Sequence, residues 1–197
     1  MLGLAWILVP ALGVAFAASA QALTVDFEGL ADGAAVTTQI AGATFSNAVV
    51  LSSGLTLNEF EFPPHSGVSV ASDDGGAMQI VFDAPATAAS AFFTYTSALT
   101  LTAFDAGGNS VATAASLFAN NTALSGVAGS NANELISLAA AVGITRITIL
   151  GDVAGGSFVV DDLVVTAVPE ASTYALMLSG LLLVAWMRSR RLREQRS

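Results

Sequence analysis

Carboxylates are the side chains in this sequence with the most capacity for chemistry, and most of them lie in its middle. Of 15 acidic residues in the 197-residue chain, all but Glu170 and Glu194 fall between residues 23 and 168. Arg146 is the only base in that region, and the chain has no lysine. Nucleic-acid backbones are bound by clustered cations, so this acidity excludes nucleic acid as a partner. It suits solubility, divalent cations or an anionic matrix that such cations cross-link.

Four acids near the two ends of this region could bind calcium. Asp26 and Glu28 end the first apolar alternating run, and Asp161 and Asp162 lie within the last one. Calcium takes carboxylate and carbonyl oxygens, and the first and last strands of a sandwich can be neighbours. The sequence therefore allows a structural calcium ion at these residues or at the turn Asp73-Asp74-Gly75-Gly76, and no other cofactor is expected. The plainer interpretation is that these acids cap turns and protect strand edges.

Catalysis by paired carboxylates would need two acids that face one cleft. Consecutive strand residues point to opposite faces, so Asp161 and Asp162 can share a cleft only if a bulge intervenes. The one histidine, His65, lies in the turn Pro63-Pro64-His65-Ser66-Gly67, and no Gly-x-Ser-x-Gly sequence accompanies it. We expect no catalytic residues and no enzymatic activity, with glycan hydrolysis as a remote alternative.

The residues that must position these acids alternate with a period of two, which is typical of strands. Short runs rich in Val, Ile, Thr and Phe are separated by Gly, Asn, Asp and Ser. They predict strands at 23–27, 43–45, 49–51, 68–71, 78–82, 91–95, 99–105, 111–116, 134–137, 144–150 and 158–166, with 138–142 as a connection. Because no useful helix interrupts them, residues 23–167 are expected to form one antiparallel β-sandwich of the jelly-roll type. The chain has no cysteine, so this domain must rely on its core and on any bound metal.

Both ends of the chain read as targeting segments. Residues 2–18 are almost entirely apolar and lead to two small-residue sites, which end at Ala20 and Ala22. We therefore assign residues 1–22 as a signal helix cut by signal peptidase. No charged residue occurs from Ala171 to Met187, a stretch of about 25 Å as helix. It is expected to be a transmembrane helix, with the basic tail 188–196 kept in the cytoplasm by Arg188, Arg190, Arg191 and Arg193.

The segment 168–197 resembles the PEP-CTERM sorting signal of Gram-negative bacteria. The motif residues are Val168, Pro169, Glu170, Ala171, Ser172 and Thr173, followed in order by the apolar run and the arginine cluster. The family usually has a second proline where this chain has Ala171. The resemblance implies an exosortase that cleaves near the motif and releases the protein from transient membrane anchoring. An ordinary C-terminal membrane anchor is the alternative.

The domain between these ends is also similar to exported bacterial domains that carry the same tail. The similarity rests on Val25-Asp26-Phe27-Glu28-Gly29-Leu30, on the Pro-Pro-His segment and on Gly155-Gly156-Ser157-Phe158. Those domains resemble galactose-binding-like and lectin-like jelly rolls. Residues 23–167 contain no tryptophan, and Tyr95 is their only tyrosine, so no sugar-stacking surface stands out.

The sequence thus predicts an exported, exosortase-sorted, non-catalytic protein of the cell envelope or exopolysaccharide (biofilm) matrix. It would be membrane-anchored at first and then reach the cell surface or matrix, where exopolysaccharide is a candidate partner. The alternative is a calcium-dependent, lectin-like carbohydrate-binding module.

Overall fold

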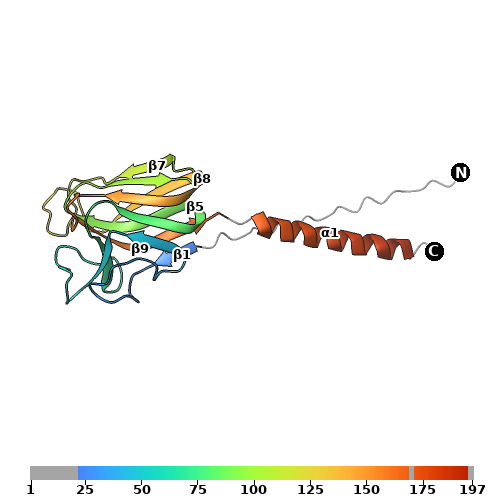
Figure 1. Ribbon diagram of the computed structural model, residues 1–197, viewed down its shortest axis with the longest axis horizontal. Helices are drawn as coiled ribbons and strands as arrows, with labels where there is room; N and C mark the ends of the chain where they lie inside the picture. Colours follow the sequence, from blue (N-terminus) through green and yellow to red (C-terminus); the bar gives the residue numbers. More distant parts are fainter. Residues whose placement is uncertain (1–21, 169–170, 195–197) are drawn as a thin grey trace. The chain divides into compact units, whose positions relative to one another are not determined.

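The computed structural model describes residues 22–168 and 171–194, and residues 22–168 belong to one compact unit. Nine strands form in that unit (Figure 1), and all strands that are hydrogen-bonded to one another run antiparallel. They are β1 (Ala22–Val25), β2 (Ala43–Ser46), β3 (Ala48–Ser52), β4 (Ser69–Asp73), β5 (Met78–Tyr95), β6 (Thr100–Phe104), β7 (Ser110–Ala115), β8 (Glu134–Leu150) and β9 (Phe158–Ala167). The predicted all-β, antiparallel class is confirmed.

The observed strand boundaries differ from the predicted ones mainly because two long strands, β5 and β8, each join two predicted strands. The predicted strands 78–82 and 91–95 are the two ends of β5, and 134–137 and 144–150 are the two ends of β8. The prediction of a connection at 138–142 is wrong, because Leu138 and Ala139 pair with β5 in the same ladder. Alanine-rich segments have weak strand propensity, and here the pairing partner outweighs it.

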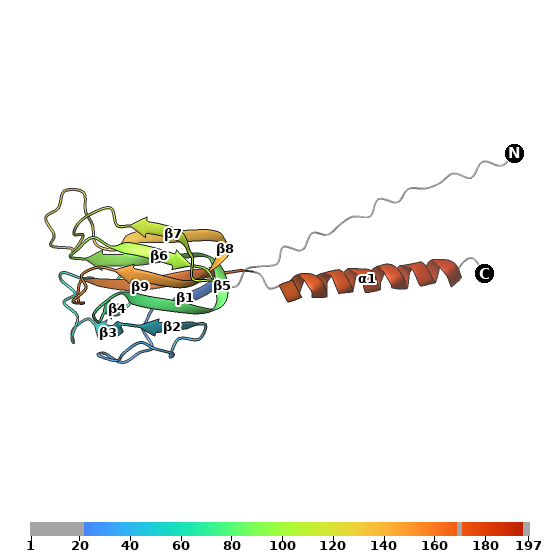
Figure 2. The ribbon, with the colours of Figure 1, turned by 45° about the horizontal axis from the view of Figure 1, so that its top comes forward.

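These long strands fold one continuous sheet into two layers. Residues 78–81 of β5 pair with 146–149 of β8, and residues 88–93 pair with 134–139, with register shifts in between. The first layer is therefore β2, the start of β5, the end of β8, β6 and β7. The second is β3, β4, β9, the end of β5 and the start of β8, with β1 on β9. Figure 2 shows β5 and β8 curving at one end of the resulting β-sandwich.

The bend at which β5 and β8 pass from one layer to the other contains residues that are disfavoured in regular strands. Pro85 lies in β5 at the register shift, where a missing N–H breaks no ladder bond. Opposite it, Gly143 has φ +93°, and a Cβ there would lie 3.2 Å from the Pro85 side chain. The buried positions change phase across this point, so both halves of each strand face the same core.

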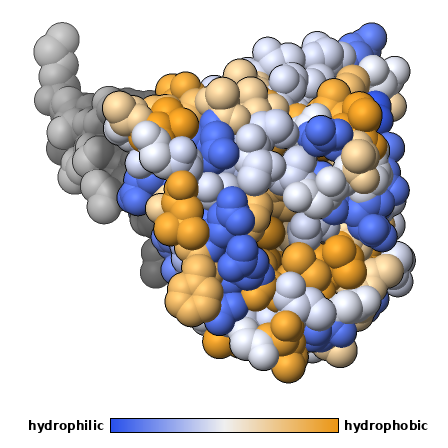
Figure 3. All heavy atoms as spheres, turned by 90° about the vertical axis from the view of Figure 1, so that its left-hand side faces the viewer, coloured by the Kyte–Doolittle hydropathy of each residue, from blue (hydrophilic) through white to orange (hydrophobic). Residues whose placement is uncertain are grey.

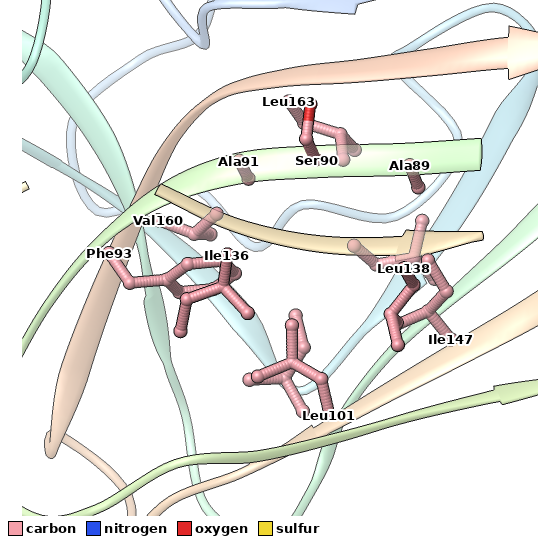
Figure 4. Close-up of a pocket in the computed structure, with 12 residues that line it drawn as sticks. Ala89, Ser90, Ala91, Phe93, Leu101, Ile136, Leu138, Ile147, Val160 and Leu163 are labelled. Carbon is pink, nitrogen blue, oxygen red and sulfur yellow. The ribbon is translucent and has the colours of Figure 1, made fainter. Parts of the chain in front are cut away.

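The core lies between the two layers, and Figure 4 shows side chains of both pointing toward one another. Its main members are Phe45, Met78, Ile80, Leu101, Ile147 and Ile149 from the first layer and Phe93, Ile136, Leu138, Val160, Leu163 and Val165 from the second. They leave a void of only about 10 Å³ between them. Protein interiors have few voids larger than a water molecule, and this core follows that rule.

The loop between β3 and β4 covers part of the outer face of the second layer. Leu57 and Phe62 from this loop pack on Val70 of β4 and Val159 of β9, in a small cluster separate from the main core. Outward-facing residues of β9 therefore become buried, which sets the surroundings of the candidate site.

The remaining described segment is α1 (Ala171–Glu194), which lies outside the sandwich unit. Within residues 22–168 and 171–194, no helix is long and apolar enough to cross a membrane. The predicted transmembrane helix 171–187 is thus not supported: its apolar run is short, is interrupted by Ser179 and Gly180, and continues into arginines. The signal segment up to Gln21, with Ala20, and the motif residues Pro169 and Glu170 lie outside the described residues.

The bend predicts an unequal response to alanine at two glycines. Gly143→Ala should lower the free energy of unfolding by about 1–3 kcal/mol, because φ +93° is strained for any residue with a Cβ. Gly29→Ala should change it by less than about 0.5 kcal/mol, since Gly29 has open space around its Cβ position. Urea unfolding of both variants checks this, and equal losses would contradict it.

Candidate functional site

A β-bulge in β9 brings Asp161 and Asp162 to the same region. Asp161 pairs with Phe92 of β5, the register then shifts, and Val164 pairs with Ser90. Asp162 takes φ 47°, a left-handed value that aspartate tolerates better than most residues. The bulge that Asp161 and Asp162 would need in order to share one cleft is therefore present.

Asp161 is buried beneath the β3–β4 loop, and that loop satisfies its carboxylate. The backbone N–H groups of His65 and Ser66 donate to Oδ2 at 2.8 and 2.9 Å. The N–H of Asp162 donates to Oδ1 at 2.7 Å. Burial is the main influence on this group and raises the pKa of the Asp161 carboxyl above its ordinary value, although the three N–H groups favour the charged form.

Asp162 binds the side chains of the same two loop residues. Its Oδ2 lies 2.6 Å from Nδ1 of His65, and its Oδ1 accepts a hydrogen bond of 2.9 Å from the Ser66 hydroxyl. The imidazole stacks on Phe92 with ring centroids 3.4 Å apart and planes 8° from parallel. About 36% of the His65 side chain is exposed. A flat, partly exposed ring thus lies beside a carboxylate.

Glu28 holds the next part of this loop. Its Oε1 accepts the N–H groups of Val68 and Ser69 at 2.8 and 2.7 Å. Gly67 is required between the two sets of bonds, because its φ is +53° and a Cβ would clash with the Glu28 carboxylate. We call residues 65–69 the acid-bound loop, since Glu28, Asp161 and Asp162 all bind it. Asp26, the fourth predicted ligand, instead accepts the N–H of Glu28.

This arrangement does not have the geometry of a catalytic triad. In a triad the imidazole lies between the serine and the carboxylate, whereas here Asp162 lies between His65 and Ser66. The two N–H groups that could have stabilised an oxyanion are bonded to Asp161. The cluster orders a loop, and its exposed part is the stacked imidazole.

For metal binding, no group of three or more His, Asp or Glu side chains in the described part of the chain is arranged to hold an ion. Three of the four predicted ligands share one loop, but they bind its N–H and side-chain groups. Asp73, from the second candidate turn, is buried and accepts the N–H groups of Ser157 and Phe158 at 2.8 and 2.9 Å. A structural calcium ion stays a prediction.

A second network, which the sequence did not reveal, orders the long loop between β7 and β8. The buried Asn121 accepts the N–H of Tyr95 at 2.7 Å and donates to the carbonyl of Phe93 at 2.9 Å. Glu134 accepts the Tyr95 hydroxyl and, at 3.0 Å, the N–H of Leu117. Burial, followed by the bond to Glu134, raises the pKa of Tyr95 to about 12. A buried asparagine within a polar loop carries no local sequence signal.

Several hollows lie on the surface of the sandwich, and two of them are lined in part by β9. One of about 180 Å³ is formed by Thr56, Leu57, Asn58 and Phe62 of the β3–β4 loop against Phe158 and Val159 of β9. Another of about 310 Å³ lies where β1 begins and β9 ends, lined by Leu23, Phe82 and Val165 among others. At the loop end, Figure 3 shows apolar side chains scattered among hydrophilic ones.

No protein-family model and no curated protein matches this chain. Solved structures give weak likenesses. The K2 cleaved adhesin domain of Lys-gingipain has 14% identity and a TM-score of 0.47, over 74% of this chain and 99% of that one. A DUF4465 family protein from Bacteroides caccae has 10% identity and a TM-score of 0.49, over 82% and 99%. A family 29 carbohydrate-binding module, solved as a mutant with cellulohexaose, has 11% identity and a TM-score of 0.38, over 74% of this chain and 91% of that one. Because these TM-scores are below 0.5, the β-sandwich assignment rests on the strand pairing.

The acid-bound loop predicts different costs for two neighbouring substitutions. Asp161→Asn should lower the free energy of unfolding by about 2 kcal/mol, because it weakens a buried acceptor of three N–H groups. Asp162→Asn, at a more exposed carboxylate, should cost less than about 1 kcal/mol. Urea unfolding and hydrogen exchange at the His65 and Ser66 amides report the two effects, and a larger cost at Asp162 would contradict the assignment.

The Tyr95 network predicts a loss of stability in alkali. In the unfolded chain the phenol ionises near its ordinary pKa of 10.0, whereas in the fold it keeps its proton to about 12. Between these values the unfolded state binds fewer protons, so stability falls as pH rises. Phenolate absorbance of residues 22–168, where Tyr95 is the only tyrosine, measures the folded pKa. Glu134→Gln should lower that pKa; ionisation of the folded wild type near 10 would refute the burial argument.

Proposed function

We propose that this chain is an exported, non-catalytic surface or matrix protein that is processed at its C-terminal sorting motif. One observation carries the proposal: the folded domain stops where the motif starts. The last backbone bond at this end of the sandwich runs from the Val168 N–H to the Pro85 carbonyl at 2.8 Å. Pro169 follows directly in the sequence, so cleavage at or after the motif would leave every strand of the sandwich intact.

The strand pairing also supports export with two processed ends. Ala22 pairs with Thr166, so the beginning and the end of the domain lie side by side at one end of the sandwich. Cleavage after Ala20 would leave β1 complete, and cleavage after Ala22 would remove its first pair. The acids that could have served catalysis are engaged with loops, which favours a structural role. Helix α1 enters this proposal only as the segment that carries the end of the motif, the apolar run and the arginines; no membrane crossing is proposed for it.

A carbohydrate-binding role is the second candidate, and the His65–Phe92 stack favours it. A flat aromatic face beside a carboxylate offers both the apolar surface and the hydrogen-bond acceptor that sugar recognition uses. This candidate predicts that the protein binds exopolysaccharide of its producing cell and that His65→Ala abolishes binding. Titration with and without chelator tests the calcium requirement, and Val153→Ala, at an exposed position in another loop, is the control.

Processing at the motif can be tested in the producing host by intact mass. Wild type should yield a surface or medium product that starts between Gln21 and Leu23 and ends near Pro169. The double variant Pro169→Ala, Glu170→Ala should keep residues up to Ser197, because the motif core is lost. Ala171→Pro, which restores the usual second proline, should be processed at least as completely as wild type.

Glu59→Ala is the matched control, since it removes an acid without touching the motif. Normal processing and localisation of the double variant would overturn the sorting proposal, whereas a wild type that keeps residues up to Ser197 would favour an ordinary C-terminal anchor.

A further inference from the structure

The two long sides of the sandwich differ in how their edges are protected. On one side the segment between β1 and β2 runs along the outer strands and forms backbone hydrogen bonds with them. The Val36 N–H donates to the Ala48 carbonyl of β3 at 2.8 Å, and the Val50 N–H of β3 donates to the Ala34 carbonyl at 2.9 Å. The Phe45 N–H of β2 donates to the Thr37 carbonyl at 2.8 Å. The backbone of these edge strands is therefore already used. β7, which ends the strand order on the other side, has no such cover within residues 22–168.

The hydrogen-bond pattern shows which β7 groups face outward. The Ser116 N–H donates to the Leu99 carbonyl, which fixes the phase of the β6–β7 ladder. Bonds in an antiparallel ladder alternate, so Ala114 and Ala112 exchange bonds with β6 while the N–H and C=O of Thr113 and Ala115 point away from it. An extended backbone is the partner that satisfies such a row of groups.

Protein sheets usually protect an edge with lysine, proline or a short strand. β7 reads Ser-Val-Ala-Thr-Ala-Ala over six residues and has no lysine or proline, and its one irregularity, a register shift at Val111, lies near its start and leaves 112–115 in regular pairing. No charged residue occurs from Val111 to Asn133, on a chain with a net charge of −9. Two copies that meet at β7 therefore bring no acids together, and the side chains there are small and uncharged, with the β-forming Val111 and Thr113 among them.

We infer that β7 pairs with β7 of a second copy of this chain, antiparallel and about a two-fold axis at Thr113. The two Thr113 residues then exchange both of their outward backbone bonds, and the first layers of the two copies join into one sheet. This interface is isologous, so it closes as a dimer. It is independent of the proposed sorting and of any ligand at His65.

The contact is small, so its strength depends on concentration. Two six-residue strands cover far less than the roughly 1,600 Å² of a standard interface, and the dimer is therefore weak in dilute solution. Copies concentrated on a surface or in a matrix reach a high effective concentration, at which the same contact forms. Because the subunits are acidic, added salt should strengthen the dimer by screening their repulsion.

Sedimentation equilibrium of residues 22–168, a unit with its own core, tests the inference from about 10 μM to about 1 mM. Wild type should show a monomer–dimer equilibrium that shifts toward dimer with salt. Thr113→Pro removes an outward N–H but no β6–β7 bond, and it should weaken association at least about tenfold. Thr113→Lys should do the same. Hydrogen exchange at Thr113 and Ala115 should slow as the protein concentration rises.

Thr44→Lys is the control, because Thr44 is also an exposed strand threonine but lies on β2, whose edge is covered. It adds the same charge and should dimerise as wild type does. Circular dichroism confirms that each variant is folded. A wild type that stays monomeric to about 1 mM, or association that Thr113→Pro does not weaken, would overturn the inference.

Discussion

Carboxylates that accept backbone N–H groups hold the long loops of this domain in place. A protein without cysteine has no disulfide to do so, and loops carry many polar groups that need partners. Glu28, Asp161 and Asp162 bind the β3–β4 loop, Asp73 binds the β8–β9 loop, and Glu134 binds the start of the β7–β8 loop. The acidity that excluded nucleic acid therefore has an architectural use. A charged acceptor is also a stronger partner for an N–H group than a neutral one.

The second constraint is the bend that β5 and β8 share. Because each strand passes through both layers, neither layer can form without the other, and the core between them is completed by the same two strands. Contacts between residues far apart in the sequence dominate such a topology, which is typical of slowly folding β proteins. Pro85 and Gly143 place the bend, and the β3–β4 loop then covers the outer face on which Asp161 would otherwise be exposed.

Alternation and turn residues were enough to find every strand, because half-buried strands have a strict period of two. They could not show that 78–82 and 91–95 belong to one strand, since Pro85 reads as a break unless its partner, Gly143, is known. Asp161 and Asp162 could be singled out, yet their meeting depends on a bulge that only pairing with β5 creates. The stack of His65 on Phe92 and the burial of Asn121 join residues 27 and 28 positions apart, which no local pattern records.

The pairing of β1 with β9 has a mechanical consequence. The first residue of β1 and the end of β9 are neighbours in an antiparallel ladder, with Ala22 opposite Thr166. Tension applied between the two ends of the domain would load these bonds one pair at a time, as in opening a zipper, instead of shearing them all together. The domain would therefore yield at low force if it were stretched as a link in a chain. Held through one end only, the ladder carries no such tension, so this topology suits a pendant unit on a surface.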